Sequence, residues 1–240
     1  MRKARKMGIA AVMLTAGAAM ASAQDRVEAS ASADFVSQYV WRGQDLGGIS
    51  VQPSLGLSWR GLSLTAWGNV GFDSGDTKEL DLTLGYSVGG FNVGVTDYWF
   101  NSGPDERYFY YGAHSTAHVF EANVGYDFGP LALQWYTNFA GNDYKPGDDG
   151  SQKHAYSSYV ELSAPFRLGG MEWLAAVGAV PYEASAIYAD VDGFAVTNVS
   201  LRTTKEVAVT PRFTVPLFAS VSANPATQKA YFACGFTLRP

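Results

Sequence analysis

Long stretches of this sequence alternate apolar and polar residues with a period of two. In ELDLTLGYSV, residues 79–88, the even positions are apolar and the odd positions are polar or small. HVFEANVGYDF, residues 118–128, repeats the pattern. Such alternation predicts β-strands with one apolar and one polar face. Twelve runs of this kind begin near Val27, Ser50, Leu62, Glu79, Phe91, His118, Leu131, Tyr156, Met171, Phe194, Val207 and Lys229.

The length of these runs points to a membrane. They extend over about ten residues, whereas strands of globular proteins are commonly ~5–6 residues long and a tilted spanning strand needs about 9–11. Backbone groups in lipid must all be paired within the protein, so spanning strands have to close on themselves. The sequence therefore predicts an all-β fold, a transmembrane antiparallel up-and-down β-barrel of twelve strands.

The connections between the runs alternate in length. Tight turns are expected at Arg60-Gly61, Gly89-Gly90, Gly129-Pro130 and 168–170, and longer segments at 73–78, 101–117, 141–154 and 182–193. Outer-membrane barrels show this asymmetry, with short periplasmic turns on one rim and long extracellular loops on the other. A soluble β-sandwich has no physical reason to enforce it.

Aromatic residues fall near the ends of the runs. Two groups, beside the tight turns and beside the long loops, fit the aromatic belts that flank the apolar band of a barrel in a bilayer. The alternative is a set of ordinary sheet-edge aromatics over a soluble core. The groups are Trp59, Phe91, Phe128, Phe166 and Trp173 on one side and Trp41, Phe72, Trp99, Phe139 and Tyr156 on the other.

The chain begins with a secretory signal. MRKARK is followed by an apolar run to Met20 and by Ala21-Ser22-Ala23, which predicts a signal peptide over 1–23 and a single barrel domain over 24–240. Removing four of the 17 basic residues leaves 13 against 22 acidic ones, a net charge of −9. Nucleic acid is therefore not an expected partner. The one cysteine, Cys234, forms no internal disulfide.

The stretch FVSQYVWRGQD, residues 35–45, places a permanent charge behind an apolar, aromatic run. In a barrel the apolar face meets lipid and the polar face lines the lumen. We expect Phe35 and Trp41 to face outward from the first strand, and Arg42 to face inward at the loop-side mouth.

Other charged residues also fall on the inward set. The arginines are expected on one arc of the ring and most carboxylates on the opposite one, apart from Glu28, Asp34 and Arg167. This separation would give a transverse field that sorts polar solutes. Alternatively, the same side chains pair into a network that fills the lumen. The expected lumen-lining residues are Arg42, Glu79, Asp81, Glu121, Asp127, Glu161, Glu172, Arg202 and Arg212.

The amino-terminal block resembles a known family. DFVSQYVWRGQDLGG, QPSLGLSWRGLSLTAWGN and ELDLTLGYS are similar to the TorF-type porin family of bacterial outer-membrane proteins, and the resemblance covers residues 30 to 100. It implies an outer-membrane β-barrel and supplies no catalytic residues. The carboxyl end departs from the common outer-membrane pattern, because it closes with Arg239-Pro240 and lacks a terminal aromatic residue.

We expect no enzymatic activity and no cofactor. A Ser–His–acid site needs a placed histidine, and the three histidines, His114, His118 and His154, lie in or beside long loops without a motif that fixes a nucleophile. A metal held by His114 and His118 with Asp105 and Glu106 is an alternative to plain surface histidines. No calcium-loop spacing surrounds Asp148-Asp149.

Two functions of different classes follow. The first is passive diffusion of small polar or charged solutes through an outer-membrane channel, with outer-membrane lipids as surroundings and the barrel-assembly machinery as a partner during biogenesis. The second is a non-conducting barrel that binds a partner through its loops or serves a structural role. The richest contact surface would be Arg107, Tyr108, Phe109, Tyr110 and Tyr111, in a segment that could instead fold into the pore.

Overall fold

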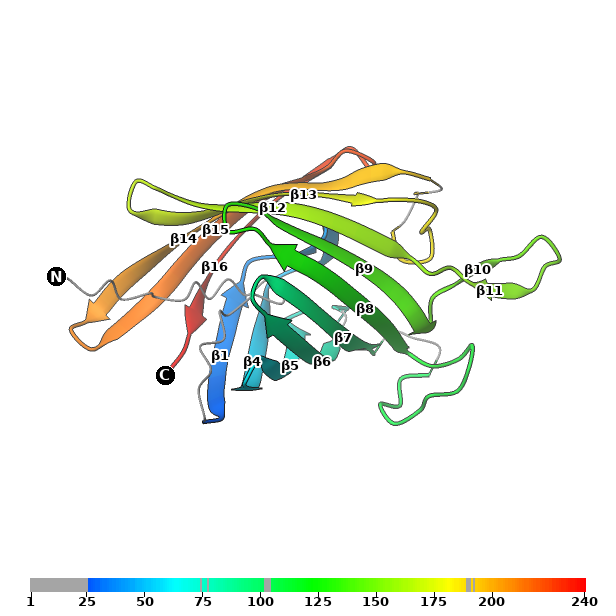
Figure 1. The fold of residues 1–240 in the computed structure, drawn as a ribbon, viewed down its shortest axis with the longest axis horizontal. Coiled ribbons are helices and arrows are strands. Elements are labelled where there is room, and N and C mark those ends of the chain that lie inside the picture. The colour runs from blue at the N-terminus through cyan, green and yellow to red at the C-terminus, as the bar shows by residue number, and fades with distance from the viewer. Residues whose placement is uncertain (1–25, 74, 77, 102–104, 189–190, 192) are drawn as a thin grey trace.

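The computed structural model describes residues 26–240 except 74, 77, 102–104, 189–190 and 192. The predicted signal peptide lies outside the described residues. Twelve antiparallel strands close into one barrel in the order β1-β16-β15-β14-β13-β12-β9-β8-β7-β6-β5-β4. Figure 1 shows how these strands are arranged. Their bounds are β1 Glu28–Val36, β4 Ser50–Trp59, β5 Leu62–Gly71, β6 Glu79–Val88, β7 Phe91–Phe100, β8 His118–Asp127, β9 Ala132–Gly141, β12 Ser158–Leu168, β13 Met171–Val180, β14 Ala195–Thr210, β15 Phe213–Asn224 and β16 Lys229–Leu238.

The alternation of apolar and polar residues predicted where the barrel strands begin, with one exception. Every predicted run but one begins within two residues of the first residue of a barrel strand. The run expected from Val207 is wrong: this residue belongs to β14, and β15 begins at Phe213. Val207 and Val209 continue the alternation of β14 to Thr210, and the chain turns only at Pro211-Arg212.

Short and long connections alternate around the barrel, as predicted. The short turns lie between β4 and β5, β6 and β7, β8 and β9, β12 and β13, and β14 and β15. The connections on the other rim include 37–49, 101–117, 142–157 and 181–194. The start of β1 and the end of β16 lie on the turn rim. A small hairpin, β10 (Tyr144–Pro146) with β11 (Gln152–His154), projects from the loop rim (Figure 1).

The two faces of the wall are inverted relative to a soluble protein. Leu84 on the outer face is 58% exposed, whereas Asp81 on the inner face of the same strand is fully buried. The outer band is made of similar apolar side chains, among them Leu55, Leu64, Val95, Leu133, Leu162, Val177, Leu217 and Phe232. Among the described residues, no helix is long and apolar enough to cross a membrane.

The inner face differs between the two halves of the barrel. Toward the loop rim, Gln52 and Asn69 are buried and joined by a hydrogen bond of 3.0 Å from Gln52 Nε2 to Asn69 Oδ1. Toward the turn rim, Ser58 is exposed and Thr65 is half-buried. The lumen is therefore accessible from the turn rim and filled near the loop rim.

The filling comes from a segment that was expected in the wall. β1 ends at Val36, and residues 37–49 turn into the barrel as a hairpin of β2 (Tyr39–Trp41) and β3 (Gln44–Gly47). The prediction that Trp41 faces lipid is therefore wrong: its ring stacks on Tyr188 with centroids 5.9 Å apart and meets Tyr98 edge-on. Phe35 does lie on the outer face, where it stacks on Phe236 at 4.8 Å.

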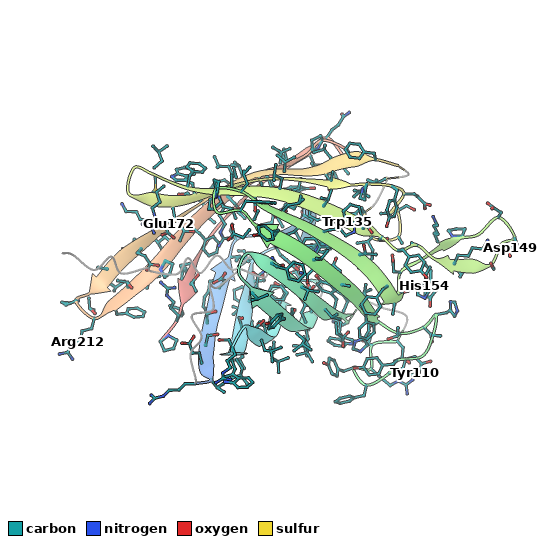
Figure 2. The ribbon with its side chains drawn as sticks, in the orientation of Figure 1. Tyr110, Trp135, Asp149, His154, Glu172 and Arg212 are labelled. Atoms are coloured by element: carbon teal, nitrogen blue, oxygen red, sulfur yellow. The ribbon has the colours of Figure 1, made fainter. Side chains whose placement is uncertain are left out.

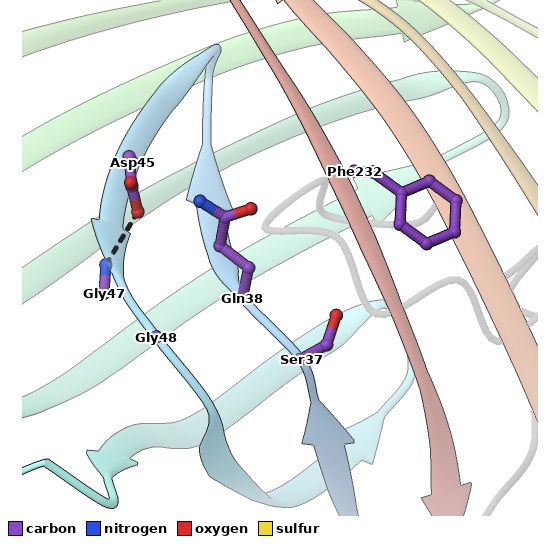
Figure 3. A pocket seen from close by; sticks show the side chains of 6 residues that line it. All are labelled: Ser37, Gln38, Asp45, Gly47, Gly48 and Phe232. Atoms are coloured by element: carbon purple, nitrogen blue, oxygen red, sulfur yellow. Dashed lines mark hydrogen bonds between the residues drawn. The ribbon is translucent and has the colours of Figure 1, made fainter.

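The inward turn leaves part of β16 without a neighbour from β1. β1 pairs with β16 only from Ala33–Val36 to Gly235–Leu238. The main-chain pairing of β1 with β16 ends at Ser37. Here the N–H of Cys234 donates to the side-chain Oγ of Ser37 at 2.9 Å and not to a main-chain carbonyl. Beyond this point lies a pocket of about 650 Å³ between the hairpin and β16, lined by Ser37, Gln38, Asp45, Gly47, Gly48 and Phe232 (Figure 3).

Candidate functional site

The inward hairpin, which we call the plug hairpin (residues 37–49), carries Arg42 at its tip. Trp41 pairs with Gln44, so Arg42 and Gly43 form a two-residue turn with φ values of 47° and 78°. Two successive positive φ values are the signature of a type I′ turn, which favours Asn-Gly or Gly-Gly. Arginine in this region costs about 1–3 kcal/mol and persists only where other contacts hold it.

Those contacts are made by the guanidinium of Arg42. Nη1 and Nη2 donate to the two carboxylate oxygens of Glu121 on β8 at 2.6 and 2.9 Å, and Nη1 also donates to Tyr188 Oη at 2.9 Å. The side chains of Arg42 and Glu121 are only 7% and 6% exposed. A bidentate arginine–carboxylate pair out of water is among the strongest polar contacts available to a side chain.

Aromatic rings surround the same guanidinium. Its Cζ lies 4.1 Å from the ring centroid of Tyr136 on β9, 4.7 Å from that of Tyr159 on β12 and 4.4 Å from that of Trp41. Each ring presents the negative face of its quadrupole to the cation, a contact worth about 0.5–2 kcal/mol depending on its desolvation. The strain at the tip is thus offset by an ion pair and three cation–π contacts.

Gly43 lets the tip of the plug hairpin lie in close contact with the main chain of β14. A Cβ atom at this position would lie 1.8 Å from the carbonyl oxygen of Thr197. The register between β13 and β14 shifts here, so that Gly178 faces Asn198 and Ala179 faces Val196, which leaves Thr197 in a β-bulge. Bulges redirect a strand locally and are common beside functional sites. Asn224 Nδ2 donates to the Gly43 carbonyl at 3.0 Å and holds the tip from β15.

The loop between β13 and β14 completes the filling. Tyr188 and Ala184 from this loop form a buried cluster with Tyr136, Tyr159 and Val180, against which Trp41 packs. Tyr188 stacks on Tyr159 with centroids 5.9 Å apart. The loop is tied to the projecting hairpin by an ion pair of 2.6 Å between Lys145 Nζ and Glu183 Oε2. This contact lowers the pKa of the Glu183 carboxyl, chiefly through the hydrogen bond from Lys145.

Two acidic residues on β6 form no ion pair with any of the described residues. Glu79 and Asp81 are buried on the inner face, and neither oxygen of Asp81 has a hydrogen-bond partner in the part of the chain that is described. Asp81 lies in register with Trp67, whose ring packs against Tyr39 of the plug hairpin at 5.7 Å. The lumen beside β6 is therefore enclosed and lined by acidic side chains.

The remaining predicted lumen residues lie elsewhere. Glu161 is buried beside the plug and accepts a hydrogen bond from Tyr159 Oη at 2.8 Å. Asp127 and Glu172 lie near the turn rim, where Asp127 accepts from Gly129 N and Glu172 pairs with Arg167 at 2.6 Å. Arg202 is on the inner wall, with its Cζ 4.0 Å from the centroid of the Phe218 ring.

The two-arc arrangement of charge differs from the prediction. Arg212 is exposed in the turn between β14 and β15, at one end of the molecule in Figure 2, because Pro211 places it beyond the end of the strand. Arg42 lies on a hairpin and reaches across the lumen to Glu121, which it neutralises. Of the three arginines expected on the positive wall, only Arg202 occupies it, and the alternative of a paired network describes the loop-side half of the lumen.

The aromatic loop 105–117 lies outside the barrel. Tyr108 packs on Trp99, and its carbonyl oxygen lies 2.6 Å from His118 Nε2. His118 faces the outer side of β8, where Asp97 Oδ1 approaches its Nδ1 at 2.7 Å. The alternative in which this segment narrows the pore is therefore wrong, because its contacts are with outward-facing residues. His114 stacks on Tyr144 instead of joining His118, so the residues proposed for a metal do not converge.

The five predicted contact residues of this loop have different surroundings. Phe109 is 87% exposed and Tyr111 is about half exposed, over His118. Tyr110 Oη is hydrogen-bonded to Ser115 Oγ at 2.9 Å. Arg107 pairs with Asp105 and lowers the pKa of that carboxyl to about 2, mainly through their side-chain hydrogen bond. The loop thus has an ordered base on the outer wall and an aromatic tip in solvent.

The sequence reasoning missed the inward tyrosines. Tyr98, Tyr136 and Tyr159 line the loop-side half of the lumen and contact Arg42 or Glu121, as does Tyr188 from the loop. The first three occupy the polar set of their strands, so tyrosine at a position where the alternation demands a polar residue is the signal that could have identified them.

Comparisons with known proteins find similarity among solved structures. Neither the known protein families nor the curated proteins contain a match to this sequence. Among solved structures, the chain is similar to the NanC porin in its rhombohedral crystal form, with a TM-score of 0.48 and 8% sequence identity over 88% of this chain and 98% of that one.

Proposed function

We propose that this protein is an outer-membrane channel for the passive diffusion of small polar or charged solutes, and that the plug hairpin holds it closed. The observation that supports it is the inverted wall: apolar side chains such as Leu84 face outward while Asp81, Glu79 and Asn69 are enclosed. A water-soluble protein would enclose the apolar face of these strands and leave the ionisable side chains in water, because burying such side chains is costly. A barrel in lipid instead exposes its apolar face to the lipid and encloses its polar face in the lumen.

Several finer expectations belong to this proposal. Export by the signal peptide 1–23, assembly into the bacterial outer membrane and membership of the TorF-type porin family all agree with an apolar belt around a polar lumen. The solute path would enter through the accessible turn-side half and end at the plug, where Arg42 and Glu121 are paired.

Conductance of the purified protein in planar bilayers tests the proposal. We expect rare openings of the wild-type channel and frequent openings of Arg42→Ala, because the plug loses its strongest contact. Arg212→Ala is the matched control, since it removes an arginine that lies outside the lumen. Folded protein that shows no openings in any variant over a wide voltage range would reject the channel.

The unpaired half of β16 supplies a route for opening. If the register of β1 and β16 continued beyond Val36, Trp41 would stand opposite Ala230 and face outward beside Phe232. Residues 37–41 would then extend the wall in the space next to the pocket of Figure 3. The sequence pattern that predicted a longer first strand would describe this open state.

A disulfide trap tests this route. Trp41→Cys with Ala230→Cys, in a Cys234→Ser background, should cross-link under oxidation, because directly opposed residues of an antiparallel pair fall within disulfide range. In the closed arrangement the Trp41 side chain points across the lumen to Tyr98. We expect oxidation to lock high conductance and reduction to reverse it. A conducting channel that never forms the cross-link would disprove this route and leave the channel proposal standing.

A second candidate function rests on the exposed tip of the loop 105–117. Phe109 and Tyr111 present apolar area to solvent above an ordered base, as at many protein interfaces. Deleting 104–113 separates the two functions: a channel should still conduct in Arg42→Ala, whereas a loop-mediated binding protein should lose its partner and show no conductance before or after the deletion.

A further inference from the structure

One side of the lumen forms a pocket of wall residues around the Arg42 guanidinium. Tyr98, Glu121, Tyr136 and Tyr159 project inward from β7, β8, β9 and β12, four strands that are consecutive in the barrel. We call these four residues the wall pocket. Tyr98 Oη donates to Glu121 Oε1 at 2.9 Å, so the carboxylate is held in place by the wall itself. The pocket therefore belongs to the barrel and not to the hairpin that fills it.

Arg42 shows what kind of group the wall pocket accepts. It enters from the plug hairpin, and its planar cation is fixed by two hydrogen bonds to Glu121 and by the rings of Tyr136 and Tyr159 at 4.1 and 4.7 Å. A carboxylate in the plane of a guanidinium and aromatic rings on its faces match this ion specifically. A neutral urea group has the same shape but lacks the charge that these contacts recognise.

The neighbouring wall offers further acceptor groups for a guanidinium or amine. Beside β7, the acidic side chains of Glu79 and Asp81 are buried on the inner face of β6. Glu161 lies next to the wall pocket on β12. Their carboxyl oxygens can accept hydrogen bonds from the N–H groups of a guanidinium or amine.

We infer that the wall pocket is a binding site for the guanidinium or amine group of organic cations, and that Arg42 is an internal ligand that competes for it. This inference rests on the proposed channel and names its solute class. A cationic solute that enters the pocket displaces Arg42 and with it the tip of the plug hairpin. If Arg42 served only to hold the plug hairpin in place, the emptied pocket would instead bind urea as well as guanidinium.

Rescue by a small ion tests the inference. Arg42→Ala empties the pocket, and guanidinium chloride at millimolar concentration should bind it, as measured by isothermal titration calorimetry, and lower the channel current. Urea at the same concentration should do neither. Adding Glu121→Gln to Arg42→Ala should weaken guanidinium binding at least tenfold, because the neutral amide cannot replace a charge-assisted pair. Sodium chloride at equal ionic strength is the control for screening.

The wild-type protein provides a measurement that needs no variant. Argininamide should accelerate amide hydrogen exchange in residues 37–49, because it competes with Arg42, whereas citrullinamide, its neutral urea counterpart, should not. Equal effects of the charged and neutral compounds in both experiments would overturn the inference. Guanidinium binding to Arg42→Ala without conductance in any variant would sustain the pocket and reject the channel. Conductance without preference for guanidinium over urea would reject the pocket alone.

Discussion

The Arg42–Glu121 pair allows the stability of the plug to be predicted. Arg42→Ala removes a bidentate ion pair, a hydrogen bond to Tyr188 and cation–π contacts, and it leaves Glu121 buried without its cation. Removing one partner of a buried pair costs about 3–5 kcal/mol. Since 1.4 kcal/mol is a factor of ten, the ratio of closed to open channels should fall by a factor of about 10² to 4 × 10³.

Single-channel recording in planar bilayers measures this ratio as the open probability. Glu121→Gln should raise the open probability in the same direction, because it leaves the Arg42 charge without its partner carboxylate. The double variant Arg42→Met with Glu121→Met is the decisive comparison. Replacing both charges by apolar side chains removes the penalty of an unpaired ion, so its open probability should lie below those of the single variants Arg42→Met and Glu121→Met.

Two results would refute the reasoning. The first is an open probability of Arg42→Ala equal to that of the wild type, with heat-dependent mobility on SDS gels showing a folded barrel. The second is a double variant whose effect is the sum of the single ones, which would mean that Arg42 and Glu121 act independently and do not hold the plug as a pair.

Three further predictions concern other parts of the fold. Gly43→Ala should open the channel, because the added methyl group would lie 1.8 Å from the main-chain oxygen of Thr197. Gly150→Ala is the matched control, since Gly150 has a similar φ of 75° but no atom within 4 Å of the added methyl group. Equal conductance of the two variants would disprove the close contact between Gly43 and Thr197. Lys145→Met should increase hydrogen exchange in residues 183–188 at neutral pH. Because the pKa of Glu183 is lowered, the ion pair with Lys145 stabilises the loop at pH values above the ordinary glutamate pKa, and this stabilisation is lost as the pH falls through the lowered pKa. The difference in exchange rate between Lys145→Met and wild type should therefore vanish in acid. A difference that persists in acid would contradict the ion pair. Leu84→Arg should destabilise the barrel in bilayers by about 2–4 kcal/mol, measured by urea unfolding in lipid, if this face meets hydrocarbon; an unchanged free energy of unfolding would argue against that placement.

The sequence alone determined most of the wall of this protein. Alternation with a period of two is a local property, because successive side chains of a strand point to opposite faces whatever the rest of the chain does. Residues 79–88 could therefore be recognised as a strand, and Leu84 and Asp81 assigned to opposite faces, without knowledge of their neighbours. The alternation of short and long connections then fixed the two rims.

Only the tertiary structure decided what fills the lumen. Residues 35–42 alternate equally well in the wall and in a hairpin that turns inward, and an aromatic residue such as Trp41 packs against lipid or against Tyr188 with similar ease. The contact between Arg42 and Glu121 joins residues 79 apart in the chain, and no local pattern records which carboxylate a charge will reach. The β-bulge at Thr197 that receives Gly43 depends on the register between β13 and β14. Strand faces are set by backbone geometry, whereas the closed plug is set by long-range packing and ion pairing.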